Sequence, residues 1–114
     1  MTSEDTVDWD EYQQWCVVGV LPSTHVEGHP LVYPALGLAG EAGEYVDKVK
    51  KTIRDGLKLA DYEEMAKELG DVLWYLAVSA EYLGFDLSAI VEMNMQKLNA
   101  RREAGTVQGS GDNR

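Results

Sequence analysis

Two stretches decide the fold: residues 35–54, ALGLAGEAGEYVDKVKKTIR, and residues 61–83, DYEEMAKELGDVLWYLAVSAEYL. In the first, apolar side chains recur every three or four residues, at Ala35, Ala39, Ala42, Val46, Val49 and Ile53. In the second, the same spacing runs through Met65, Leu69, Val72, Leu76, Ala80 and Leu83. This period places one apolar stripe along an α-helix. We therefore predict helices over residues 31–54 and 61–83, with Asp61 as the N-cap of the second.

Shorter helices are expected on both sides of this pair. Residues 5–20 begin with acids and carry spaced apolar side chains, which favours a first helix. Residues 21–30 are rich in proline, glycine and hydroxyl side chains, which predicts a loop. Gly84 ends the third helix, and Asp86 or Ser88 can cap a fourth over residues 87–102. The glycine-rich residues 105–114 are expected to form a flexible tail.

Short links between long amphipathic helices favour antiparallel neighbours. We therefore predict an all-α fold, an antiparallel helical bundle of about four helices in a single domain spanning residues 1–114. No stretch of the sequence predicts a β-strand.

Charge and composition narrow the partners. The chain contains ten Lys and Arg residues and twenty Asp and Glu residues, which gives a net charge of −10. This negative charge repels the phosphate backbone of a polymeric nucleic acid. No run approaches eighteen apolar residues and the N-terminus is polar, so we expect a cytoplasmic protein without a membrane partner. The single cysteine, Cys16, is expected to be a packed apolar thiol.

The two long helices carry acids in matching pairs. Glu41 and Glu44 lie three residues apart, as do Glu68 and Asp71, so each pair leaves one helix face within a turn, about 60° apart. Both pairs lie beside the apolar stripe, where antiparallel helices would approach. Four converging carboxylates repel one another, and a hard divalent cation such as Mg²⁺, with Mn²⁺ as the alternative, would offset that repulsion. The alternative is two solvated helix shoulders without a metal.

Glycines accompany these acids at positions 37, 40, 43 and 70. A glycine inside a helix costs roughly 0.5 to 1 kcal/mol relative to alanine, so a reason for each is expected. Close approach of a backbone or a ligand is one explanation, and tight helix packing without a ligand is the other.

A basic face is predicted on the fourth helix. Asn94, Lys97 and Arg101 stand at i, i+3 and i+7, and their amide, ammonium and guanidinium groups suit phosphate binding. The alternative is a solvated basic helix end favoured by the helix dipole. Lys48, one turn beyond Glu44, is a further candidate for substrate binding.

Aromatic side chains near the loop allow two interpretations. Trp9 and Trp15 lie in the first predicted helix, and His29 and Tyr33 lie in or next to the loop. They could stack on a base, but packing in the core or between subunits is the more frequent use of such side chains.

Three segments together resemble the MazG-like all-α nucleoside triphosphate pyrophosphatases: GLAGEAGE ending at Glu44, ELGDVLWYL beginning at Glu68, and NMQKLNAR from Asn94 to Arg101. The resemblance covers roughly residues 31–114, and the closing GSGDNR is similar to the tail of a compact subgroup, where it can fold over a site. Many relatives carry an acid where this chain has Gly40, so the resemblance assigns no general base.

The resemblance implies that Glu41, Glu44, Glu68 and Asp71 bind Mg²⁺ and act in catalysis. It implies that Asn94, Lys97 and Arg101 contact the nucleotide. It also implies homodimers or homotetramers in which a neighbouring subunit helps to complete each site.

The resulting hypothesis is a Mg²⁺-dependent pyrophosphohydrolase that cuts an NTP or dNTP at the α-phosphorus, giving the monophosphate and pyrophosphate. In-line attack by water needs positioning and charge stabilisation but no covalent nucleophile. Two alternatives stay open: a non-catalytic helical assembly module, and an activity like that of the phosphoribosyl-ATP pyrophosphohydrolases.

Overall fold

The computed structural model of the chain describes residues 6–112, which form four α-helices and no β-strand. The helices are α1 (Trp9–Val18), α2 (Val32–Asp55), α3 (Leu59–Leu83) and α4 (Leu87–Ala104), with a short 3-10 helix, η2 (Pro22–Thr24), in the first loop. The all-helical prediction is confirmed for these residues. Residue 5 of the first predicted helix and residues 113–114 of the predicted tail lie outside the described residues.

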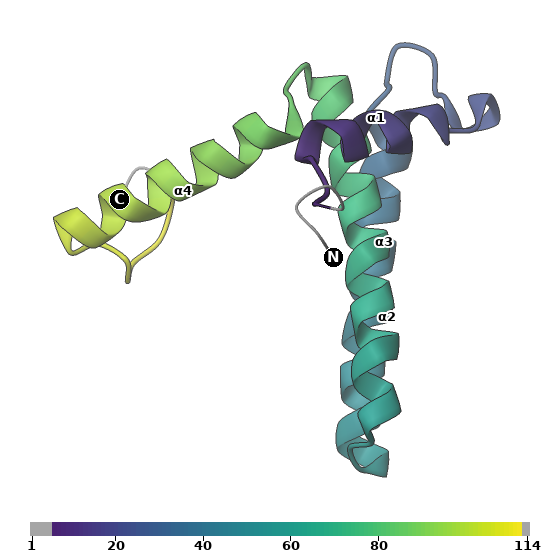
Figure 1. The fold of residues 1–114 in the computed structure, drawn as a ribbon, viewed down its shortest axis with the longest axis vertical. Helices are drawn as coiled ribbons and strands as arrows, with labels where there is room; N and C mark the ends of the chain where they lie inside the picture. Colours follow the sequence, from purple (N-terminus) through teal and green to yellow (C-terminus); the bar gives the residue numbers. More distant parts are fainter. Residues whose placement is uncertain (1–5, 113–114) are drawn as a thin grey trace.

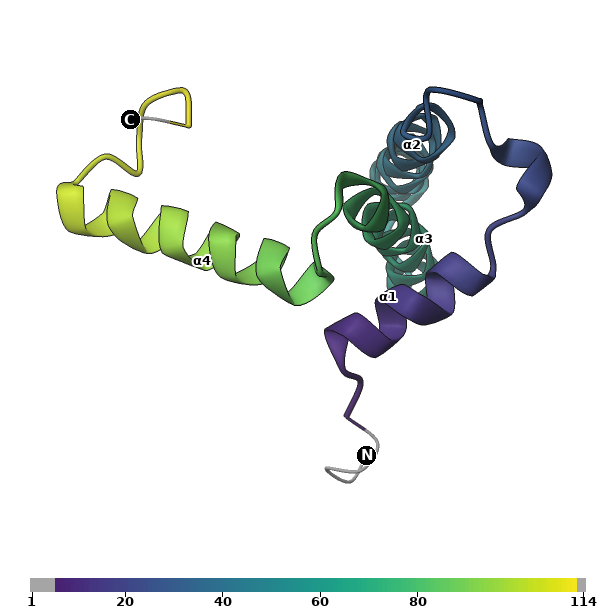
Figure 2. The same ribbon diagram turned by 90° about the horizontal axis from the view of Figure 1, so that it is seen from above.

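α2 and α3 form a long antiparallel hairpin, α1 crosses the end of that hairpin, and α4 runs away from it (Figure 1 and Figure 2). The Cα radius of gyration is 17.0 Å, whereas a compact chain of this length has about 13 Å. The predicted antiparallel arrangement therefore describes α2 and α3, but α4 departs from the predicted four-helix bundle. Its apolar residues Met93, Met95 and Leu98 remain at least 37% exposed, so no packing against the hairpin holds α4 alongside it.

The turn between α2 and α3 is set by Gly56 and Asp61. Gly56 has φ +91°, a conformation that glycine adopts readily, and it ends α2. α3 then begins at Leu59, two residues before the predicted start, with Lys58 as its N-cap. Asp61 is therefore the third residue of the helix, and not its N-cap as predicted. The Asp61 carboxylate accepts the Lys58 backbone N–H at 2.9 Å, so Asp61 stabilises the N-terminus of α3 from a position in its first turn.

Only one of the four glycines that accompany the acids lies against another element. The ring of Tyr75 on α3 packs directly on Gly37, where a Cβ atom would overlap it. A Cβ atom at Gly40, Gly43 or Gly70 would have no heavy atom of another described element within 4 Å. Helix packing thus explains Gly37, and the other three glycines leave open space on the surface of the hairpin.

The core of the described residues is small and lies where α1 crosses α3. Its fully buried apolar side chains are Cys16, Ala77, Val78 and Leu87, which confirms Cys16 as a packed thiol. Many large apolar side chains are exposed instead, among them Trp15 at 68% and Ile53 at 80%. No helix within residues 6–112 combines the length and apolarity of a membrane span.

Side chains of α1 hold the corner between α3 and α4. Gln13 is fully buried; its amide nitrogen donates to the Phe85 carbonyl at 2.9 Å, and its amide oxygen accepts the Leu87 N–H at 2.8 Å. Asp10 accepts the Ser88 N–H at 2.9 Å and the Ser88 hydroxyl at 2.7 Å. Asp86 occupies the predicted N-cap position, but its side chain makes no capping hydrogen bond. The first turn of α4 is therefore capped from α1.

Replacing Gln13 by alanine should lower the free energy of unfolding by about 2 to 4 kcal/mol, because the Phe85 carbonyl and the Leu87 N–H would lose their partner inside the core. Urea unfolding followed by circular dichroism measures this change. Gln14→Ala is the matched control, since Gln14 makes one exposed hydrogen bond to Glu81 and should cost less than about 0.5 kcal/mol. Equal effects of the two substitutions would contradict a structural role for the Gln13 hydrogen bonds.

Candidate functional site

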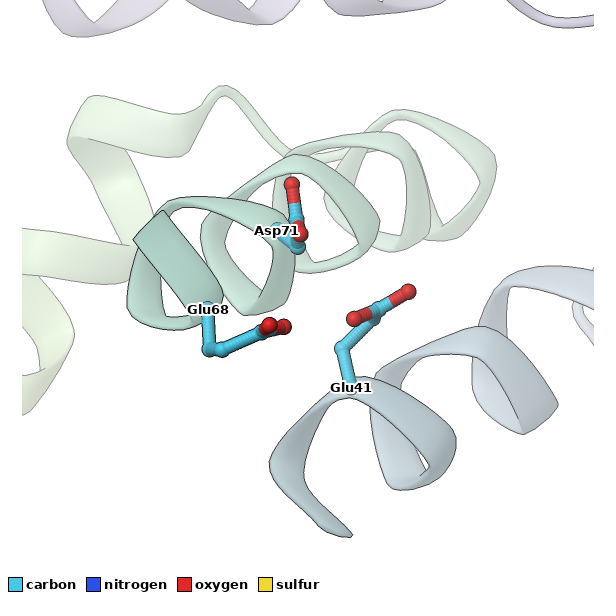
Figure 3. A group of neighbouring side chains, drawn as sticks. All are labelled: Glu41, Glu68 and Asp71. Carbon is cyan, nitrogen blue, oxygen red and sulfur yellow. The ribbon is translucent and has the colours of Figure 1, made fainter. Parts of the chain in front are cut away.

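Three of the four predicted acids meet between α2 and α3. Glu41 on α2 and Glu68 and Asp71 on α3 each offer a carboxylate oxygen within 4.8 Å of the others. Glu68 and Asp71 share a face because they lie three residues apart on one helix. Figure 3 shows Glu41 and Glu68 directed toward each other across the space between the helices, with Asp71 nearby.

Glu44 lies one turn along α2 from Glu41 and is exposed. Its carboxylate stands outside the group that the other three acids form among the described residues. The hairpin therefore places a three-carboxylate cluster, with a fourth acid at its edge.

The cluster carries excess negative charge. Partial desolvation, followed by the charges of Asp71 and Glu68, raises the pKa of Glu41 above its ordinary value. Lys48 lies at one side, with its ammonium 3.6 Å from a Glu68 oxygen and 4.0 Å from a Glu64 oxygen. One shared ammonium does not balance three acids, so the cluster is well suited to a cation.

The donor set fits a hard divalent cation. All three ligands are carboxylate oxygens, which Mg²⁺ and Mn²⁺ prefer, and the group contains no thiolate or imidazole among the described residues. Mg²⁺ commonly keeps several waters and shares its remaining positions with substrate phosphates. Exposure of Asp71 leaves room for such ligands.

Two aromatic side chains connect the cluster with a second cavity. Trp74 and Tyr75 follow Asp71 at i+3 and i+4 and line a shallow pocket together with Glu41 and Asp71. The same two side chains also line a cavity of about 180 Å³ between α3 and the first loop, to which Tyr33 and Tyr82 contribute. Burial, then a hydrogen bond with Tyr33, raises the pKa of Tyr75. The acids and the aromatic cavity are therefore neighbours.

The sequence indicates this aromatic cavity only in part. Tyr33 is among the aromatic residues considered for stacking, but Trp9 and Trp15 are absent from the cavity lining, and Trp15 stacks on Tyr12 at 6.1 Å between ring centroids. The signal for the other lining residues is the Trp-Tyr pair that follows Asp71, because spacings of three and four place all three side chains on one face of α3.

The predicted basic face lies elsewhere in the chain. Asn94 is exposed, whereas Lys97 and Arg101 contact the tail: the Lys97 ammonium and an Arg101 terminal nitrogen lie 3.2 Å and 3.3 Å from an Asp112 oxygen. At 1.5 Å per residue, Asp71 lies ~20 Å along α3 from the corner, and Lys97 lies ~15 Å along α4. The two helices diverge from that corner (Figure 1), so one chain does not bring these groups together.

Comparison with known proteins agrees with these features. Residues 34–106 match the MazG nucleotide pyrophosphohydrolase domain. The chain is also 45% identical over 92 residues to the Gene 37 protein of Mycobacterium phage L5, a match that covers 78% of this chain and 79% of that protein. No solved structure matches the chain. The domain match covers α2 from Pro34 onward, α3, α4 and all three clustered acids, and the chain belongs to the MazG nucleotide pyrophosphohydrolase family.

Proposed function

We propose that the protein hydrolyses a nucleoside or deoxynucleoside triphosphate at the α-phosphorus, in a Mg²⁺-dependent reaction that yields the monophosphate and pyrophosphate. The observation that carries this proposal is the contact between two sites: the Glu41, Glu68 and Asp71 cluster opens beside an aromatic cavity, and Trp74 and Tyr75 line both. Family membership supports a nucleotide as the substrate.

Glu41, Glu68 and Asp71 would hold the metal, with Glu44 available as a further ligand or as the group that orients water. Bound Mg²⁺ would lower the pKa of a coordinated water and neutralise charge on the phosphates. Glu41 or Glu44 would accept a hydrogen bond from the attacking water and align it with the α-phosphorus. The carboxylates are positioned by two rigid helices, so little reorganisation would be needed.

The aromatic cavity would receive the base. Its volume of about 180 Å³ is smaller than the roughly 300 Å³ of a site that encloses a drug-sized ligand, so it suits one ring system. Trp74, Tyr75, Tyr33 and Tyr82 offer stacking faces. A base in this cavity would leave the phosphates near Asp71, on the side where the acids lie.

Lys97 and Arg101 would serve the phosphates of a neighbouring copy. Within one chain they lie far from the carboxylates, while exposed apolar side chains such as Leu36 at 68% and Val46 at 62% leave part of the α2 surface uncovered. Burying such side chains is the usual driving force for a homodimer or homotetramer. In that assembly, Lys97 and Arg101 would stabilise the departing pyrophosphate, and Asn94 would contact the nucleotide.

Purified protein with Mg²⁺ should convert at least one member of an NTP and dNTP panel into equal amounts of monophosphate and pyrophosphate. Glu68→Ala should lower kcat by at least about 10³-fold, because removal of a ligand disrupts metal-assisted catalysis. Anion-exchange separation of the products measures both. Glu63→Ala removes an exposed acid of the same helix and should keep full activity.

Product identity separates the alternatives. Release of phosphate in place of pyrophosphate would contradict attack at the α-phosphorus. If phosphoribosyl-ATP is hydrolysed and no NTP or dNTP of the panel is, the substrate is of the phosphoribosyl-ATP kind. If none of these compounds is hydrolysed, a non-catalytic assembly module is favoured.

Glu41→Gln should have opposite effects on thermal stability with and without metal. Without metal, loss of one of three like charges should raise Tm by roughly 1 to 3 °C, because the charges of Asp71 and Glu68 oppose the Glu41 carboxylate. With Mg²⁺ the wild type should gain stability by ligand linkage, and the variant should lose most of that gain. Differential scanning calorimetry measures both shifts.

Glu63→Gln is the matched control and should leave both melting temperatures unchanged. A Glu41→Gln variant that melts lower than the wild type and keeps the full Mg²⁺ shift would show that Glu41 is a structural acid.

Mixing two inactive variants tests the shared site. Glu68→Ala and Arg101→Ala should each abolish turnover, but unfolding and refolding them together should restore activity, to about one quarter of the wild type for a dimer with two shared sites. The reason is that half of the dimers are mixed, and each of those holds one intact site. No recovery from a mixture shown by native mass spectrometry to contain mixed oligomers would place both residues in the same chain's site.

A further inference from the structure

The C-terminal tail turns back onto α4. Gly105 has φ +69° and ends the helix, and the Thr106 N–H donates to the Arg101 carbonyl at 2.8 Å. Gly109 and Gly111, with φ +128° and +84°, allow the chain to reverse, because other residues rarely adopt these conformations. The result is a segment that runs beside the helix from which it emerged (Figure 2).

This reversal places an anion on the two cations of α4. One Asp112 oxygen lies 3.2 Å from the Lys97 ammonium and 3.3 Å from an Arg101 terminal nitrogen. The Gly111 carbonyl accepts from the same Arg101 nitrogen at 3.1 Å. Lys97, and then Arg101, lower the pKa of Asp112, so this carboxylate is ionised at neutral pH. An oxyanion held between an ammonium and a guanidinium has the chemistry of a bound phosphate oxygen.

The tail satisfies Arg101 only in part. Both tail contacts use one terminal nitrogen, and the Arg101 Nε is buried without a hydrogen-bond partner among the described residues. An oxyanion with several oxygens can occupy two edges of a guanidinium, whereas the Arg101 contacts from residues 105–112 fall on one nitrogen. The arrangement is therefore a weaker match for Arg101 than a phosphate group would be.

Exposure differs sharply between the two partners. The Arg101 side chain is 8% exposed, whereas that of Asp112 is 81% exposed. An external anion cannot reach Arg101 while the tail covers it. The carboxylate that holds the tail is already largely in water, so its departure forfeits only a solvent-screened ion pair.

We propose that Asp112 is an internal competitor for the phosphate-binding cations of α4, and that a polyphosphate ligand binds Lys97 and Arg101 by displacing the tail. The identity of the ligand rests on the proposed function, but the competition itself concerns any oxyanion of this kind. Inorganic pyrophosphate, the proposed product, is the simplest probe because its binding requires no turnover.

Calorimetric titration of metal-free protein with pyrophosphate tests the competition. Asp112→Asn should lower Kd by about 3- to 10-fold, since it removes a competing ion pair that includes one nearly buried partner. Glu103→Gln, an exposed acid of α4 with the same change of charge, is the matched control and should alter Kd by less than about 2-fold. In an Arg101→Ala background, Asp112→Asn should lose most of its effect.

A second readout follows the tail in the wild type. Saturating pyrophosphate should shift the amide resonances of Gly109 and Gly111 toward positions typical of a mobile chain. Weaker pyrophosphate binding by Asp112→Asn would show that the tail builds the site, and equal effects of Asp112→Asn and Glu103→Gln, or no binding by either, would also overturn the proposal. If Asp112→Asn binds pyrophosphate more tightly but the wild type hydrolyses no nucleotide, the proposed function is refuted and the competition by the tail still holds.

Discussion

The direction of α4 depends on two side chains of α1. Gln13 joins the Phe85 carbonyl to the Leu87 N–H, and Asp10 caps the next residue, Ser88, so the backbone around the corner is fixed by one helix. Because Gln13 is fully buried, moving the chain away from this corner would take both of these partners from its amide. Among the described helices, α1 and α3 contact α4 at its base, and this explains how α4 can extend away from the hairpin without another helix packed along its length.

In the hairpin, close packing takes the place of side-chain hydrogen bonds in positioning one helix against another. Gly37 lets the ring of Tyr75 lie against α2, and the same close contact fixes the height of α2 relative to α3. That height brings Glu41 level with Glu68 and Asp71. The acids repel one another, so packing at neighbouring turns must hold them together whenever no cation is bound. A site whose repulsion is already offset by packing is ready to bind a cation without large rearrangement.

The sequence predicted what depends on local periodicity. The two long helices and the shared face of Glu68 and Asp71 follow from spacing alone. The direction of α4 did not, because it rests on hydrogen bonds between residues more than seventy positions apart, such as Gln13 and Phe85. The same limit applies to the aromatic cavity, where Tyr33 and Trp74 meet only after the hairpin has formed. The contact of Asp112 with Lys97 needed the left-handed glycines of the tail, whose φ angles the sequence does not specify.

Charge separation within the chain has a consequence for specificity. The acids of the hairpin repel a free polyphosphate, and the cations of α4 are occupied by Asp112. A bare anion therefore meets a barrier at both places. In the proposed assembly, a metal-bound nucleotide with an aromatic base would gain at each: its cation would offset the acids, its base would stack in the cavity, and its phosphates would replace the Asp112 carboxylate of a neighbouring copy. Because the favourable binding free energy would come from three separate places, the complete ligand would bind better than a metal ion, a base or a polyphosphate by itself.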